Sequence, residues 1–128
     1  MAFLLDTNVA IYLRDGDPDV ARRVAGLQGA ILLSIVSRVE LEGGVYREPT
    51  QAGVRRLRLD AILDALPVLA FDDAAAEAYR SILEVAGYSR CKLLDRMIAA
   101  QALVHRATLV TMNADDFKDV PGLRILAW

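Results

Sequence analysis

Short apolar runs alternate along this chain with longer stretches in which apolar residues recur at helical spacing. The short runs predict buried strands at residues 2–5, 30–33, 68–71 and 108–111, and a weaker one at 123–126. The longer stretches predict helices over about residues 9–13, from 18 onward, 36–46, 50–66, 73–85 and 92–106. Strands joined by helical crossovers form a parallel sheet with helices on both faces. We therefore expect one domain over residues 1–128: an α/β fold, namely a three-layer α/β/α sandwich whose mainly parallel central sheet has four to five strands.

Local signals predict where several of these helices begin and end. Thr7 and Asn8 are expected to cap the first helix, and Asp17 followed by Pro18 the second. Thr50 is expected to cap the long helix, and Asp72 or Asp73 the next one. The Gly43-Gly44 pair predicts the end of the helix that starts near residue 36.

Composition narrows the class of protein. The chain has 128 residues, of which 55% are hydrophobic and 25% charged, and this content predicts a folded domain. Cys91 is the single cysteine, which excludes a disulfide scaffold and favours a reducing, cytoplasmic location. No signal-like start and no apolar run of about 18 residues is present, so we expect no membrane segment. The net charge of -2 argues against a simple basic nucleic-acid binder and leaves metal-mediated binding open.

Acidic residues follow or flank several of the predicted strands. Asp6 follows the first strand, Glu40 lies in the helix after the second, and Asp95 opens the helix before the fourth. Asp115 and Asp116 follow the fourth strand. Ligands of parallel sheets bind outside the carboxyl ends of the strands, so these carboxylates are expected to gather at one edge.

Helical spacing indicates which way two of these side chains point. Glu40 shares a face with Val36 and with Gly43-Gly44, so we expect it to point inward. Asp95 shares a face with Ile98 and Ala99, which places it on the buried side of its helix.

Each acid taken alone has an ordinary structural explanation. Asp6 and Asp95 are suited to cap helices, Glu40 to lie in solvent, and Asp115-Asp116 to form a turn. Taken together they would repel one another, and a divalent cation relieves that repulsion. Oxygen ligands without His or thiolate favour Mg²⁺ or Mn²⁺ over Zn²⁺.

Four segments carry a resemblance to a known family. They are Leu-Leu-Asp6-Thr7-Asn8, the stretch from Ser34 through Glu40 to Gly44, the stretch from Asp95 to Ala102, and Thr111-Met-Asn113-Ala-Asp-Asp116-Phe117 followed by Val-Pro-Gly-Leu. In order and spacing they resemble the PIN-domain family, and within it the VapC toxins of VapBC toxin–antitoxin pairs. The resemblance covers essentially the whole chain.

The resemblance implies an endoribonuclease that depends on Mg²⁺ or Mn²⁺ and cleaves tRNA or rRNA. It puts the catalytic carboxylates at Asp6, Glu40, Asp95 and Asp116, with Asp6, Asp95 and Asp116 as metal ligands. Asp115 stays open as an alternative to Asp116 for the fourth acid. Polar positions of the family that surround the acids fall on Thr7, Asn8, Ser34, Thr111 and Asn113.

The same resemblance implies partners. A VapB-type antitoxin is expected to neutralise the protein, and the protein is expected to form a homodimer. The apolar helices between Val20 and Leu66 are candidates for either surface. Arg90, Lys92 and Arg96 flank Asp95 and are candidates for RNA binding, although Arg96 also suits a pair with a nearby acid.

Other functions compete with this interpretation. A catalytically silent PIN-like interaction module would keep the fold without the reaction. A receiver-type phosphoacceptor domain is disfavoured because Asp6 stands alone and no lysine follows Ile125. Nucleophilic catalysis lacks its residues, because His105 has no cysteine or serine partner at a useful spacing.

Overall fold

Five parallel strands form a single sheet in the order β3-β2-β1-β4-β5 in the computed structural model, which describes all 128 residues. The strands are β1 Ala2–Leu5, β2 Ala30–Ser34, β3 Val68–Leu69, β4 Thr108–Thr111 and β5 Ile125–Ala127. The helices are α1 Thr7–Arg14, α2 Pro18–Ala25, α3 Ile35–Arg47, α4 Ala52–Ala65, α5 Asp73–Ala86 and α6 Leu93–Val104. Short 3₁₀ turns are η1 Pro49–Gln51, η2 Arg90–Lys92 and η3 Ala114–Phe117. The predicted α/β/α sandwich is confirmed.

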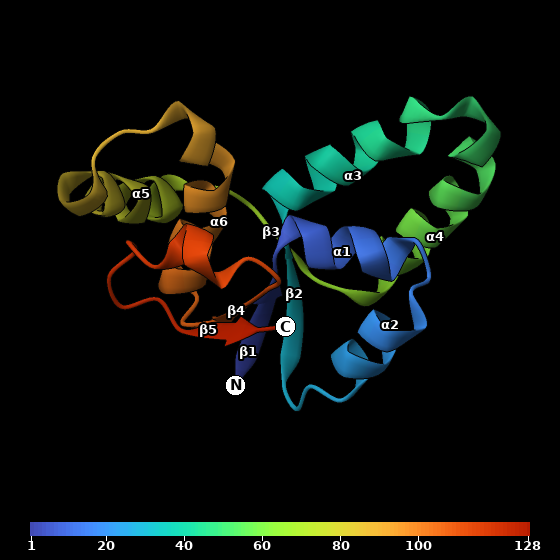
Figure 1. Cartoon of the computed structure of the whole chain (residues 1–128), viewed down its shortest axis with the longest axis horizontal. Coiled ribbons are helices and arrows are strands. Elements are labelled where there is room, and N and C mark those ends of the chain that lie inside the picture. Colours follow the sequence, from blue (N-terminus) through green and yellow to red (C-terminus); the bar gives the residue numbers. More distant parts are fainter.

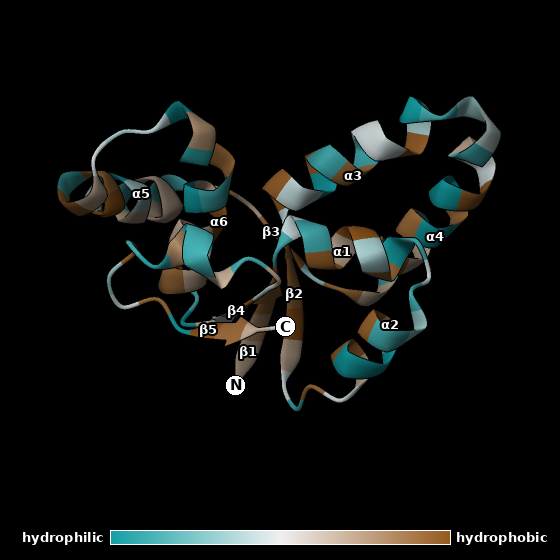
Figure 2. Cartoon of the chain, in the orientation of Figure 1, coloured by the Kyte–Doolittle hydropathy of each residue, from teal (hydrophilic) through white to brown (hydrophobic).

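The helices cover the sheet from two sides. Helices α1 to α4 lie on one side of the strands and α5 and α6 on the other (Figure 1). Strand β1 lies between β2 and β4, so it is covered on both faces and both edges. Phe3 and Leu5 pack with α1 and α2 residues such as Val9 and Val20, whereas Leu4 packs with α6 residues such as Ile98. Figure 2 shows the strands in apolar colours, and alternating colours along α2 and α4, as amphipathic helices require.

Helix α3 ends at Arg47, within one residue of the predicted range of 36–46, but it continues through the Gly43-Gly44 pair, so these glycines do not mark its end. A Cβ on Gly44 would lie 2.6 Å from Nη1 of Arg14, and Arg55 donates to the Gly44 carbonyl oxygen at 2.8 Å. The missing side chain of Gly44 therefore leaves room for the buried Arg14 to approach α3. The glycine does not end the helix. Tertiary packing here outweighs the low helix propensity of glycine, which costs about 1 kcal/mol in a helix interior.

Two expected caps also differ. Thr7 and Asn8 do not cap α1; Asp6 does, as its alternative explanation predicted, because its side chain accepts a hydrogen bond from the Thr7 amide. Thr50 lies within the 3₁₀ turn, and α4 begins after Gln51 without a side-chain cap. The expected caps of α2 and α5 are confirmed at Asp17 and Asp72.

Strand β3 is shorter than predicted and lies at an edge of the sheet. The amide of Gln101 on α6 donates to the carbonyl oxygens of Leu69 and Ala70 at 3.0 and 3.1 Å. The carbonyl groups of Leu69 and Ala70 thus bond to α6, and the strand ends before Phe71. No helix in the structure combines the length and the apolar character that crossing a membrane requires.

Candidate functional site

Asp6 lies at the carboxyl end of the central strand β1 and is held in one orientation. Its amide donates to the Val110 carbonyl oxygen at 2.9 Å, which fixes its backbone against β4. Its Oδ1 accepts from the Thr7 amide at 2.8 Å, and its Oδ2 accepts from the Thr111 hydroxyl at 2.8 Å. Thr111 Oγ1 in turn accepts from the Asn113 amide at 3.0 Å. The buried Asp6 carboxylate is therefore positioned by the neighbouring strand β4 and by the first residue of α1.

Glu40 reaches the same region from α3. The Thr7 hydroxyl donates to Glu40 Oε1 at 3.1 Å and lies 2.8 Å from the hydroxyl of the buried Ser37. Because Thr7 donates its one proton to Glu40, Ser37 donates to Thr7. Glu40 points toward the site as expected, but the residue remains exposed. Its carboxylate accepts one side-chain hydrogen bond, whereas the buried carboxylate of Asp6 accepts one at each oxygen.

Asp95 lies in the first turn of α6 and is half-buried. Burial, followed by repulsion from Asp6, Asp116 and Glu40, raises the pKa of Asp95 to about 6, against an ordinary value of 3.8. Burial also raises the pKa of Asp6, and the hydrogen bonds from Thr111 and Thr7 only partly oppose this. These carboxylates therefore lie close enough to disfavour each other's charge.

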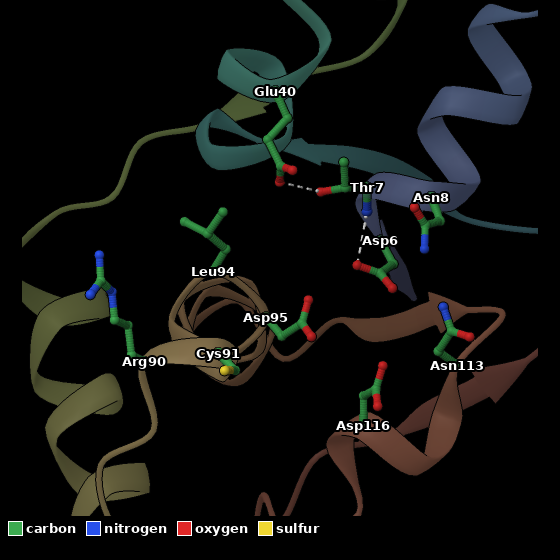
Figure 3. A pocket seen from close by; sticks show the side chains of 10 residues that line it. All are labelled: Asp6, Thr7, Asn8, Glu40, Arg90, Cys91, Leu94, Asp95, Asn113 and Asp116. Carbon is green, nitrogen blue, oxygen red and sulfur yellow. Dashed lines mark hydrogen bonds between the residues drawn. The ribbon is translucent and has the colours of Figure 1, made fainter. Parts of the chain in front are cut away.

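The four predicted acids line one pocket of about 280 Å³ (Figure 3). Asp116 on η3 faces it, whereas Asp115 does not line it, so Asp116 is the acid that the structure brings to the other three. Ten residues line the pocket: Asp6, Thr7, Asn8, Glu40, Arg90, Cys91, Leu94, Asp95, Asn113 and Asp116.

Three residues that help to build the site were not predicted. Cys91 and Leu94 line the pocket from η2 and the start of α6. Ser37 supports Thr7 from beneath without lining the pocket. Its position three residues before Glu40, on the same helical face, is the sequence signal that would have identified it.

Ser34 does not line the pocket, so the expected place of this residue beside the acids is corrected. It is fully buried, caps α3 through the Val36 amide at 3.0 Å, and donates to the side-chain oxygen of Gln101. Ser34 thus joins β2 to α6 in the interior of the protein. Thr111 is also fully buried, and it acts on the site through its bond to Asp6.

Arg96 is likewise corrected as an RNA-binding candidate. It is buried, donates to the Gly87 carbonyl oxygen, and its Nη2 lies 3.0 Å from Asp119 Oδ2. Lys92 Nζ lies 3.3 Å from the same oxygen. Consecutive residues on a helix point about 100° apart, so Arg96 faces away from the pocket that Asp95 faces. Of the three basic candidates, only Arg90 lines the pocket.

The raised pKa of Asp95 predicts that this residue destabilises the metal-free protein at neutral pH. A carboxyl whose folded pKa is raised stabilises the fold at low pH and loses that contribution as the pH rises through about 6. Because Asp95 is only half-buried, we expect Asp95→Asn to raise the free energy of unfolding by about 1 kcal/mol at pH 7.5. The gain should shrink toward pH 4.5.

Urea denaturation in EDTA at both pH values measures this effect. Asp64→Asn, an exposed aspartate on α4 outside the pocket, is the matched control and should change little. Equal or lower stability of Asp95→Asn at pH 7.5 would contradict the electrostatic account.

Comparison with known proteins places this chain in a family. The sequence matches the family model of the PIN domain over residues 3–123. It is 30% identical over 134 residues to Ribonuclease VapC2 of Rickettsia felis, covering 100% of this chain and 98% of the relative. It is 33% identical over 132 residues to the tRNA(fMet)-specific endonuclease VapC of Shigella flexneri, with the same coverage of 100% and 98%.

A solved structure agrees with this assignment. The crystal structure of VapBC2 from Rickettsia felis, bound to a DNA fragment from their promoter, matches with a TM-score of 0.86 and 29% identity. The match covers 100% of this chain and 99% of that chain. The fold, the order of the motifs and these similarities together show that the chain belongs to the PIN-domain family and, within it, to the VapC proteins.

Proposed function

We propose that this protein is the toxin of a toxin–antitoxin pair: an endoribonuclease that uses a divalent metal ion to hydrolyse RNA phosphodiesters. In this proposal the catalytic carboxylates are Asp6, Glu40, Asp95 and Asp116. One observation carries it: four acids from separate elements line one pocket, and burial and mutual repulsion raise the pKa of Asp95 there. Two relatives are named as a ribonuclease and a tRNA-specific endonuclease, which supports the same reaction.

The donor atoms suit a hard divalent cation. The structure groups no three acidic, histidine or cysteine side chains tightly enough to form a complete ligand set. Mg²⁺ does not require one, because it usually keeps several waters and binds one or two carboxylates together with substrate phosphates. We assign Asp6, Asp95 and Asp116 as the residues that would hold Mg²⁺ or Mn²⁺, which prefer such oxygen ligands.

A cation held by Asp6, Asp95 and Asp116 would supply a water of lowered pKa and would neutralise charge on the phosphate oxygens. The protein's own contribution is positioning. Thr7 and Thr111 hold Asp6, and the Thr7 hydroxyl holds the Glu40 carboxylate where it can orient the attacking water. Attack by water leaves the 2′-hydroxyl unused, so the products carry 5′-phosphate and 3′-hydroxyl ends.

We propose tRNA as the first substrate to test, because one relative is named as specific for tRNA(fMet), with rRNA as the second. Arg90 lies on the pocket wall opposite Asn8 and Asn113 in Figure 3 and is the candidate for phosphate contact. Lys92 is partly exposed but paired with Asp119, so we expect it to contribute less than Arg90 to RNA binding.

A VapB-type antitoxin and a second copy of the chain are the proposed protein partners. VapBC complexes are among the similar solved structures, which supports the antitoxin. Helices α3 and α4 expose large apolar side chains, a feature common at protein interfaces. These are Val39 (66% exposed), Tyr46 (66%), Val54 (40%) and Leu57 (73%).

Incubation of the purified chain with bulk tRNA and with rRNA tests the reaction. We expect cleavage at defined sites with Mg²⁺ or Mn²⁺, loss of cleavage in EDTA, and recovery when excess Mn²⁺ is added. Sequencing of the fragments should find 5′-phosphate ends. Cleavage that persists in EDTA, or cyclic-phosphate products, would overturn the metal mechanism. RNA binding without cleavage would instead favour the silent interaction module.

A further inference from the structure

A second cavity of about 460 Å³ opens beside the acidic pocket. The two cavities share Asn8 and Asn113, which therefore form the boundary between them. The remaining lining residues are Ile11, Tyr12, Asp15 and Met112. None of the four has a role in the reaction proposed above, so the cavity is unexplained by it.

One face of α1 builds one wall of this cavity. Asn8, Tyr12 and Asp15 succeed one another at spacings of four and three residues, which places them in a row along the helix. Met112 and Asn113 form the opposite wall from the segment after β4. That wall is anchored, because the Asn113 amide donates to the buried Thr111 hydroxyl.

The groups in this cavity are free to bind a ligand. Tyr12 is 46% exposed although it lies in the middle of a helix. The side-chain amides of Asn8 and Asn113 are exposed, and Figure 3 shows both on the same side of the acidic pocket, without a hydrogen bond to the residues drawn. An aromatic ring beside two unused amides combines a stacking surface with hydrogen-bond donors and acceptors.

We propose that this cavity binds the nucleobase of a nucleotide next to the cleaved phosphate. Single-stranded RNA is recognised by stacking of splayed bases on aromatic rings and by hydrogen bonds to base edges. Tyr12 supplies the ring, and Asn8 and Asn113 read the edge. Asp15 Oδ1 accepts from Arg14, which leaves Oδ2 to accept from an exocyclic amino group. The inference rests on the proposed nuclease function and adds a determinant of where the enzyme cuts.

The lining favours a base over other ligands. It contains no lysine or arginine, and Asp15 would repel a phosphate, so the cavity does not suit the RNA backbone itself. Two amides and a carboxylate also make it too polar for an apolar peptide side chain. Because Asn8 and Asn113 line both cavities, a base bound here lies directly beside the acidic pocket.

The test uses RNA oligonucleotides that span a mapped cleavage site, intact or with an abasic ribose on the 5′ or the 3′ side of the cut. For intact RNA we expect Tyr12→Ala to lower kcat/KM about tenfold, in line with the loss of one stacked base. Tyr12→Phe keeps the ring and should stay within about twofold. Tyr88→Ala removes an exposed tyrosine of the loop before η2 that lines neither cavity and is the matched control.

The abasic substrates separate stacking from misfolding. Wild type should lose about tenfold on one of the two abasic RNAs, and Tyr12→Ala should lose nothing further on that RNA. Equal cleavage of intact and abasic RNA by wild type, or an additive loss in Tyr12→Ala, would overturn the base site while leaving the nuclease proposal intact. Failure of the wild type to cleave any RNA would overturn both.

Discussion

Asp95→Asn should lower kcat/KM for RNA cleavage by about a thousandfold, an effect that we expect only Asp6→Asn to equal. The amide keeps the shape of the side chain but removes the charge that a divalent cation requires, and such an ion contributes several kcal/mol to stabilising the transition state. Asp6→Asn should be as damaging, because Asp6 is the most rigidly held carboxylate of the pocket.

Cleavage of a tRNA substrate in saturating Mg²⁺, with the same amounts of folded protein, measures this loss. Asp64→Asn changes the same kind of side chain on α4, outside the pocket, and should retain wild-type rates. Because Asp95→Asn should also stabilise the metal-free protein, inactivity cannot be attributed to unfolding. Activity within a few-fold of wild type would remove Asp95 from the proposed metal ligands.

Asp119→Ala should destabilise the protein by about 2 kcal/mol at neutral pH. Arg96 is 3% exposed and loses its carboxylate partner in this variant, so a buried guanidinium is left with the Gly87 carbonyl oxygen as its remaining partner. Leaving one member of a buried pair unpaired costs several kcal/mol, reduced here because Asp119 is 32% exposed. Helix α6 carries Asp95, so local loosening should also lower RNA cleavage.

Urea denaturation of Asp119→Ala, with Asp115→Ala as the exposed matched control, tests the pair. Partial burial raises the pKa of Asp119, but hydrogen bonds from Arg96 and Lys92 outweigh it and the net pKa is lowered. A carboxyl whose pKa is lower in the folded than in the unfolded protein stabilises the fold at pH values above its unfolded pKa. This contribution is lost as the pH falls through the folded pKa. The difference from wild type should therefore narrow in acid. Equal effects of the two substitutions would contradict a structural role for Asp119.

The sequence pattern predicts the strands and the acids well because both obey local rules. Buried strands appear as apolar runs, and the parallel topology brings the residues at their carboxyl ends to one edge of the sheet. Asp6 shows how two explanations coincide: it caps α1, as an isolated aspartate after a strand often does, and the same geometry points it into the pocket.

Contacts between distant segments are not visible in the sequence pattern. Ser34 and Gln101 are 67 residues apart, so nothing near Ser34 indicates a buried partner. Gly44 looks like a helix end until Arg14 is seen to pack against it. Arg96 looks like a neighbour of Asp95, yet it lies on another face of α6 and pairs there with Asp119, 23 residues later.

The sheet order has a consequence for how the protein is made. Asp6 directly follows strand β1, one edge of which is covered by β4, residues 108–111, and β4 leaves the ribosome about 100 residues after β1. Asp95 and Asp116 join the pocket from the same late part of the chain. A nascent chain that has exposed Asp6 and Glu40 therefore lacks half of the proposed catalytic carboxylates. Under the proposed function, the catalytic site is completed only when synthesis of the chain is nearly finished. An antitoxin can therefore bind the chain as its nuclease activity appears.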